Sequence, residues 1–386
     1  MKRYIAFIIS LFGLILTLHA QKSKILSVYQ YIETDMFEDA KRAVEEAIRH
    51  EKTAEWPKTW FAKGFLCQVA YEEGVKENDN KKKELYPDQL YLAYESYEKA
   101  LALDTRDRLK DQIARQYVLL SNDFQKIGKD HYQRNKFREA SKAFEHALAV
   151  AGSPVLASEV DTSLIYNAAI AAFKSHQWDR AIAHLDELNQ SGYSINTVLL
   201  LFRAQLEKGD TISAENVLRD GIERYNGNDS IILQLATLLF EVNDHEGALS
   251  VLDEASVNDS SNYIFPYTKG LIYQKLELYE EAIEAYKLAS FLAPEETGIY
   301  TSIGTCYYNI GVEIEEHART ITDRYTYRVE KAKSKTAFEK SLNWMEKAYA
   351  LDQSDQEIII KLYRLYQILQ KTDKINSLKD LVPSRD

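Results

Sequence analysis

The sequence contains little cysteine, proline or glycine: 2 Cys, 6 Pro and 14 Gly among 386 residues. Two cysteines cannot form a disulfide framework, and Cys67 and Cys306 both lie in apolar helical patterns, where a free thiol usually acts as a small core residue. No stretch rich in Gly, Pro and Ser marks a linker between domains. With 45% apolar and 28% charged residues, the composition is that of a soluble helical protein without an internal domain boundary.

Basic residues are also fewer than acidic ones: the sequence has 48 Lys and Arg and 59 Asp and Glu, for a formal net charge of −11. Nucleic-acid binding depends on clustered Lys and Arg that neutralise phosphates, so this balance predicts no nucleic-acid partner. The run of lysines at 81–83 lies among Glu77, Asp79 and Glu84 and is interpreted as a solvated loop.

Motifs that carry catalysis or hold cofactors are absent from the sequence. It contains no glycine-rich phosphate loop, no His-Glu-x2-His, no Cys-x2-Cys and no Gly-x-Ser-x-Gly. Glu313 and His317 have the spacing of metal ligands, but such a pair on an exposed helix is usually a surface pair. His131 and His146 share one repeat without a third ligand and are interpreted as packing or surface residues. We therefore predict no catalytic residue, no metal site and no cofactor.

What the sequence does contain is an internal repeat. Ala181, Ala214, Ala248 and Ala282 are 33, 34 and 34 residues apart, and each opens a spacing of small-x3-large-x2-small or apolar. The eight occurrences of this signature are Ala40/Val44/Ala47, Ala93/Tyr97/Ala100, Ala140/Phe144/Ala147, Ala181/Leu185/Leu188, Ala214/Leu218/Gly221, Ala248/Leu252/Ala255, Ala282/Tyr286/Ala289 and Ser341/Met345/Ala348. A fixed period near 34 residues predicts repeated helical hairpins.

The clearest repeat unit lies at 263–296. It has Gly270, Tyr273, Ala282, Tyr286, Ala289 and Pro294 at positions 8, 11, 20, 24, 27 and 32. The unit resembles the tetratricopeptide repeat (TPR), whose pattern is Trp-x2-Leu-Gly-x2-Tyr, then Ala-x3-Phe, then Pro. Pro266 and Lys269 depart from that pattern where Trp and Leu are usual, and the next unit supplies Tyr300 and Ile303 at those two positions. The resemblance covers nearly all of residues 24–382.

Small residues at positions 8, 20 and 27 allow neighbouring helices to approach closely, and large apolar residues at positions 4, 7, 11 and 24 fill the space between them. Aligning the signature predicts hairpins over about 24–50, 57–106, 112–150, 160–192, 195–227, 229–260, 263–296 and 297–353. Residues 356–382 are helical in pattern but weak in signature, as a terminal capping segment would be. The predicted fold is all-α: one right-handed superhelical solenoid of about eight antiparallel, TPR-like hairpins plus this capping segment, over residues 21–386.

Two of the predicted hairpins are longer than the others between their first and second helices. The position-8 glycine and the position-20 residue are 29 residues apart in the second hairpin and 37 apart in the eighth, against 12 in the unit at 263–296. The inserted segments, near 69–90 and 311–336, are charged and contain few helix breakers, so we expect longer helices that project from one edge. Such insertions often lie on a functional face, and a longer stabilising hairpin is the alternative interpretation.

The first twenty residues differ in composition from the repeats. A short positive start precedes an uncharged apolar stretch from Ile5 to Leu18, and the three residues before Gln21 are similar to a signal-peptidase site. This stretch is shorter than the ~17–25 residues that a spanning helix needs. We expect a signal peptide over residues 1–20, export to the periplasm of a Gram-negative bacterium, and no membrane span after cleavage. Because Leu18 stands where a small residue is preferred, an uncleaved N-terminal anchor is the alternative.

In the family that the sequence resembles, the first helix of each hairpin lines the concave face through positions 2, 5, 9, 12 and 13. The resemblance therefore implies a partner-binding groove lined by Phe61, Phe65, Lys129, Tyr132, Tyr166, Phe173, Arg203, Phe240, Tyr267 and Tyr308. An aromatic stripe with isolated basic groups suits an extended or helical peptide, because apolar anchors supply affinity and polar groups set orientation. The alternative is that several of these rings belong to the core between repeats.

The predicted function is a non-enzymatic protein–protein interaction scaffold, exported to the periplasm, that binds a protein or peptide partner in this groove. The alternative is an accessory subunit of a cell-envelope enzyme or secretion complex, docked through the two helical insertions. The sequence specifies neither the identity of the partner nor the oligomeric state.

Overall fold

The computed structural model describes residues 23–156 and 159–382, and every regular element within these ranges is a helix. The predicted signal peptide at 1–20 lies outside the described residues. The chain divides into two compact units, Met1–Asp210 and Thr211–Asp386, which are described separately. That residues 21–386 form one continuous solenoid stays a prediction.

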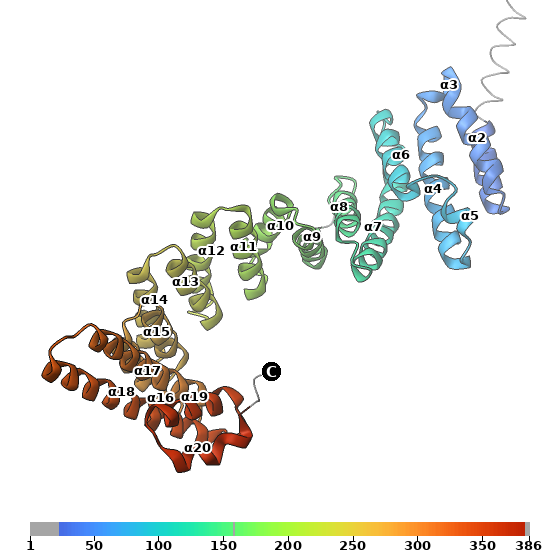
Figure 1. Ribbon diagram of the computed structural model, residues 1–386. Coiled ribbons are helices and arrows are strands. Elements are labelled where there is room, and N and C mark those ends of the chain that lie inside the picture. Colours follow the sequence, from blue (N-terminus) through green and yellow to red (C-terminus); the bar gives the residue numbers. More distant parts are fainter. Residues whose placement is uncertain (1–22, 157–158, 383–386) are drawn as a thin grey trace, which may run out of the picture. The chain divides into compact units, whose positions relative to one another are not determined.

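The first unit consists of antiparallel helix pairs (Figure 1). After a helix over residues 23–33, its elements are α2 (Phe37–Arg49), α3 (Glu51–Ala54), α4 (Pro57–Glu77), α5 (Asn80–Lys83), α6 (Gln89–Leu103), α7 (Lys110–Gln133), α8 (Phe137–Ala151), α9 (Thr162–Lys174), α10 (Trp178–Gln190) and α11 (Ile195–Lys208). Within this unit α4 packs on α6, α7 on α8 and α9 on α10, as the predicted hairpins require.

The second unit has the same construction (Figure 1). Its elements are α12 (Thr211–Arg224), α13 (Asp229–Glu241), α14 (His245–Asn258), α15 (Ile264–Lys275), α16 (Tyr279–Leu292), α17 (Thr297–Arg319), α18 (Arg324–Leu351), α19 (Gln356–Ile368), α20 (Thr372–Leu378) and the 3-10 helix η1 (Lys379–Leu381). Each predicted hairpin has its two helices, and the all-α, TPR-like fold is confirmed.

The turn inside each hairpin that lacks an insertion repeats one backbone conformation. A left-handed residue follows the first helix at Asp35, Asn135, His176, Gly209, Asn243, Glu277 and Gln370. The next amide then reaches back across the helix end: the Lys136 N–H donates to the His131 carbonyl at 2.8 Å. The Lys371 N–H donates to the Tyr366 carbonyl in the same way, at 2.9 Å. The terminal segment is therefore a further hairpin of the same kind, formed by α19 and α20.

Close approach of the two helices explains the repeat signature. The position-20 residue is fully buried in every one of the eight occurrences. A Cβ atom added to Gly270 would lie 2.5 Å from the ring of Tyr286, and one added to Gly304 would lie 2.8 Å from Met345. The missing side chain at position 8 thus leaves room for the large side chain at position 24, as predicted. Ser341, at position 20, donates a hydrogen bond to the Gly304 carbonyl at 2.7 Å.

The first insertion lengthens only one helix. Helix α4 runs to Glu77, but the chain then turns back through the short helix α5 before α6 begins. The interpretation of 81–83 as a solvated loop is wrong at its centre: the side chain of Lys82 is 9% exposed and pairs with Asp35 and Glu77. The lysine run folds onto the first hairpin because that hairpin and α4 supply the carboxylates.

The second insertion lengthens both helices, as predicted. Helices α17 and α18 contain 23 and 28 residues, against 12 and 14 in the neighbouring pair α15 and α16. Their inserted parts pack on each other, and the hydroxyl of Ser334 donates to the Gly311 carbonyl at 2.9 Å.

Both cysteines are free and buried, as the sequence predicts, and burial raises the pKa of each thiol to about 12. Over residues 23–156 and 159–382, no helix combines the length and the apolar character that crossing a bilayer requires.

Candidate functional site

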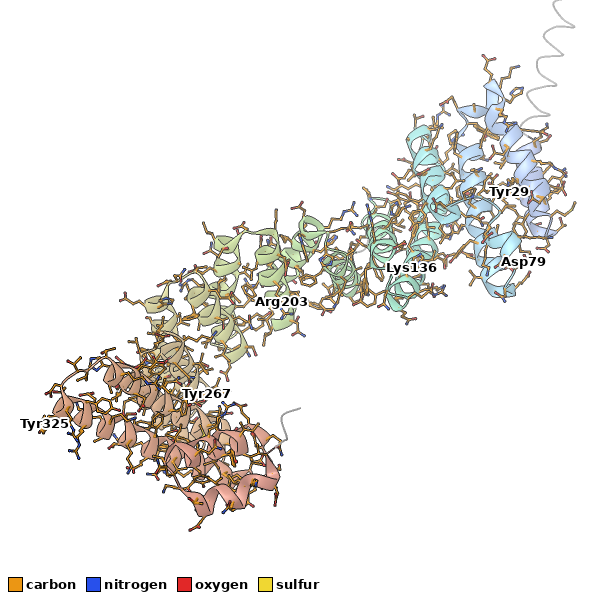
Figure 2. All side chains as sticks on the ribbon, in the orientation of Figure 1. Tyr29, Asp79, Lys136, Arg203, Tyr267 and Tyr325 are labelled. Atoms are coloured by element: carbon orange, nitrogen blue, oxygen red, sulfur yellow. The ribbon has the colours of Figure 1, made fainter. Side chains whose placement is uncertain are left out.

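The ten predicted groove residues fall in both units, and each is considered in its own unit. Residues Phe61, Phe65, Lys129, Tyr132, Tyr166, Phe173 and Arg203 belong to the first unit, and Phe240, Tyr267 and Tyr308 to the second. Arg203 and Tyr267 are labelled in Figure 2. Lys129 and Arg203 are exposed, Phe61 is buried, and the other seven are half-buried.

The predicted rings at position 12 pack within their own hairpins. Three of them contact the ring that follows five residues later, at the start of the second helix. The ring centroids are 5.1 Å apart in Tyr132–Phe137, 5.3 Å in Phe173–Trp178 and 4.9 Å in Phe240–His245. Each pair closes its hairpin turn, so one side of these rings is already covered. Tyr308 packs in a similar way on Phe338, at 5.4 Å.

The rings at position 5 also have partners. Phe61 lies 5.7 Å from Tyr97, and Tyr267 lies 5.5 Å from Tyr286. Tyr97 and Tyr286 are the large residues at position 24, so this contact joins the two helices of one hairpin. Position 5 therefore contributes to packing as well as to the surface.

A cavity of about 720 Å³ lies where three successive first helices meet in the first unit. Its lining comes from the helix over residues 23–33, from α4 with the residue before it, and from the start of α7. The lining residues are Ser23, Ile25, Leu26, Tyr29, Trp56, Lys58, Phe61, Leu109 and Gln112. Leu26 is 66% exposed, whereas Phe61 is only 6% exposed and forms the wall of the cavity.

Tyr29, labelled in Figure 2, is a residue of this cavity that the sequence analysis missed. Its ring lies 5.7 Å from Phe65, and burial raises the pKa of its hydroxyl above the usual range. The signal that could have found it is simple: counted from Ala40 at position 20, Tyr29 occupies position 9 of the first hairpin.

The second unit contains two further cavities. One of about 180 Å³ is lined by Tyr308, with Lys361 and Arg364 of α19. The other, of about 810 Å³, lies between the pair α15–α16 and the inserted part of α17 and α18. Its apolar lining includes Tyr273, Ile283, Tyr307, Ile310 and Ile314, and its charged lining includes Glu280, Glu281, Glu284, Lys333 and Lys340. The insertion was expected from the sequence, but this cavity was not.

One carboxyl group in the first insertion is electrostatically unusual. Burial, reinforced by the nearby carboxylate of Asp123, raises the pKa of Glu72 to about 7. The Gln68 amide donates to Glu72 at 2.9 Å, and Lys126 pairs with Asp123 at 3.1 Å. The first contact lies within α4 and the second within α7, and the Gln68 amide also donates to the Gln116 carbonyl of α7 at 3.3 Å.

Among the described residues, no group of three His, Cys, Asp or Glu side chains has an arrangement that could hold a metal ion. The ring of His146 lies 4.7 Å from Tyr91 and 5.4 Å from Phe124, which confirms its interpretation as a packing residue.

The fold and these cavities define a helical-hairpin repeat protein with apolar surface recesses. Residues 130–301 match the model of the tetratricopeptide repeat-like domain. The chain therefore contains a tetratricopeptide repeat-like domain.

Solved structures similar to the chain include a TPR repeats protein from Bacteroides fragilis, with 19% identity and a TM-score of 0.35 over 64% of this chain and 98% of that one. They also include MamA from Desulfovibrio magneticus, with 16% identity and a TM-score of 0.33 over 48% of this chain and 89% of that one. No curated protein matches the sequence.

Proposed function

We propose that this protein is a non-enzymatic scaffold, exported to the periplasm, that binds a protein or peptide segment along the first helices of its hairpins. The TPR-like fold itself suggests a protein–protein interaction scaffold. The main support for binding along the first helices is the 720 Å³ cavity. It is lined by the first helices of three hairpins and includes the predicted groove residue Phe61.

The chemistry of this cavity suits a peptide side chain. Its lining is mainly apolar, and Leu26 remains 66% exposed although it borders a recess. A partner that covers Leu26 and fills the recess would remove apolar surface from water, which stabilises the complex. Lys58 and Gln112 border the same recess and supply a cation and an amide that orient the partner backbone.

A photo-cross-linking experiment tests this proposal. A benzophenone amino acid is placed at Leu26 and, in a matched control, at Val257, which is 81% exposed on α14. Both sites tolerate a large side chain because both are exposed, so neither variant should unfold. We expect a defined protein adduct at position 26 and none at position 257 after irradiation in the expressing cell. Equal labelling at the two positions would refute groove binding.

Export is tested separately by the mass of the purified protein. Cleavage after Ala20 leaves Gln21 as the first residue, and the protein should fractionate with periplasmic markers. A chain that retains residues 1–20 and sediments with membranes would favour the uncleaved anchor instead.

A further inference from the structure

The inserted part of α18 is strongly basic in an acidic protein. Between residues 317 and 335 the sequence contains six cations and two anions, whereas the whole chain has a net charge of −11. The cations are Arg319, Arg324, Arg328, Lys331, Lys333 and Lys335, and the anions are Asp323 and Glu330. Figure 2 shows Tyr325 at the outer end of this hairpin, where its side chain is 78% exposed.

The outward face of this segment has a heptad-like order. Tyr325, Val329, Ala332 and Thr336 follow one another at spacings of 4, 3 and 4 residues, which places them in one line along the helix, and all four are exposed. We call this line the α18 seam. Cations flank the seam on both sides. On one side, Arg328 precedes Val329 and Lys335 precedes Thr336. On the other side, Lys333 follows Ala332, and Lys340 lies one turn after Thr336. In heptad terms, a and d are uncharged and these e and g positions are basic.

Local contacts leave these charges available. Lys333 pairs with Glu330 at 2.7 Å and Lys335 with Glu339 at 3.9 Å, in exposed pairs along one helix that contribute little to stability. Among the residues that the structure describes, Arg328 has no carboxylate partner. Lys340 lies over the ring of Tyr307, with its Nζ atom 5.4 Å from the ring centre.

The other helix of the hairpin, α17, is acidic beside this basic segment, where Glu315 pairs with Lys331 at 2.5 Å. Glu313 and Glu316 are exposed on α17, and partial burial, together with the nearby carboxylates of Glu277 and Glu280, raises the pKa of Glu313. An anionic bilayer placed against the hairpin would be repelled by these carboxylates. A helix lying along the seam meets the basic flanks, where Glu330 and Glu339 are each paired with a lysine of α18. Glu280, Glu281 and Glu284 line the adjoining cavity. The charge pattern therefore favours a protein helix over a lipid surface.

We propose that the α18 seam docks an amphipathic helix of a partner protein, whose apolar ridge lies on the seam and whose flanking Asp and Glu residues pair with Arg328, Lys333, Lys335 and Lys340. The 810 Å³ cavity begins beside Lys333, Thr336 and Lys340 and takes an apolar side chain from the ridge of that helix. Apart from Tyr325 the seam residues are small or weakly apolar, so charge complementarity sets both the choice of partner and its rate of association. This surface is independent of the groove in the first unit.

Fluorescence anisotropy on the full chain tests the proposal. The probe is a labelled three-heptad peptide with Leu at a and d and Glu at e and g, and a second probe has Lys at e and g. The test variant is Arg328→Glu with Lys335→Glu. The matched control is Lys371→Glu with Lys379→Glu, which makes the same charge change on exposed residues outside the hairpin.

We expect the acidic peptide to bind the natural protein and to gain helicity, with an affinity that falls as salt increases. The test variant should bind it at least about tenfold more weakly and should bind the Lys peptide instead, and the control should stay within about twofold. Equal weakening by both variants would overturn the proposal. Binding of anionic vesicles to the hairpin without competition from the peptide would also overturn it. So would sedimentation data that show a dimer of this chain which the test variant no longer forms.

Discussion

The two insertions occur at the same place in their hairpins, yet the first folds back and the second projects. In the first, the chain returns over α2, where the Lys41 ammonium donates to the Leu85 carbonyl at 2.6 Å and Lys63 lies 3.4 Å from the ring centre of Tyr86. In the second, the inserted parts of α17 and α18 pack mainly on each other and leave one face of α18 exposed. The first insertion therefore covers the surface of α2, whereas the second adds an exposed surface on α18.

The difference follows from where the helix breakers stand. In the first insertion Asn78 and Asp88 both adopt left-handed conformations, and Pro87 lies beside the second of them, so the chain reverses twice within a few residues. The buried amide of Gln89 then donates to the carbonyls of Cys67 and Lys82, at 2.9 and 3.0 Å. In the second insertion helix is broken only at 320–323, so both helices continue to the tip.

The largest expected effect compares one tyrosine from each insertion. Tyr86 is 8% exposed, and its hydroxyl donates to Glu45 at 3.1 Å, whereas Tyr325 is 78% exposed. Tyr86→Ala leaves a cavity under two lysines and should lower the free energy of unfolding by about 3 kcal/mol. Tyr325→Ala should change it by less than about 0.5 kcal/mol.

Urea unfolding gives these free energies, and hydrogen exchange of α2 shows where stability is lost. Tyr86→Phe is the matched control, because it keeps the ring and removes only the hydrogen bond. Equal losses in Tyr86→Ala and Tyr325→Ala would mean that the first insertion does not hold the first hairpin in place.

A smaller effect is expected from a glycine in each insertion. A Cβ atom at Gly74 would lie 2.6 Å from the backbone nitrogen of Lys83, and one at Gly311 would lie 2.8 Å from the ring of Phe338. Backbone cannot move as a ring can, so Gly74→Ala should destabilise the protein by about 1–3 kcal/mol and increase exchange in α5. Gly311→Ala should cost less than about 1 kcal/mol, because alanine also favours the helix. If α5 did not pack against α4, thermal unfolding would show the opposite order, with Gly311→Ala the more destabilised variant.

Much of the fold could be predicted from the sequence because it depends on local spacing. A small residue at position 8 and a large one at position 24 must meet if two helices pack, as Gly270 and Tyr286 do. Turn residues such as Asn135 and Asn243 accept a left-handed conformation, so hairpin boundaries also follow from residue type. The projecting insertion was predictable for the same reason, since an uninterrupted helical pattern needs no distant partner.

Contacts with distant residues could not be predicted in this way. Lys82 pairs with Asp35, 47 residues earlier in the chain, and nothing near the lysine run indicates that contact. The candidate groove was limited similarly: Tyr132 and Phe173 satisfy the groove positions, yet each ring packs on the start of its own second helix. Sequence position selected the correct helix, but only the structure shows which side of each ring is covered.

The smallest effect concerns pH, and it should have opposite signs in the two insertions. Burial raises the pKa of Glu72 in the folded protein to about 7, above its value of 4.5 in the unfolded chain. Its contribution to stability is therefore complete below pH 4.5 and is lost as pH rises through 7. In the second insertion a hydrogen bond from Lys331 lowers the pKa of Glu315, so its contribution is present above pH 4.5 and is lost as pH falls through the lowered value.

Glutamine variants separate the two groups. Glu72→Gln should raise the unfolding temperature at pH 8 and leave it nearly unchanged at pH 4.5, because the amide removes the cost of a buried charge. Glu315→Gln should lower it at pH 8, and this effect should shrink as pH falls through the lowered pKa of the natural carboxyl. If both variants shifted stability in the same direction at pH 8, the contrast between a buried, folded-back insertion and a solvated, projecting one would fail at these two residues.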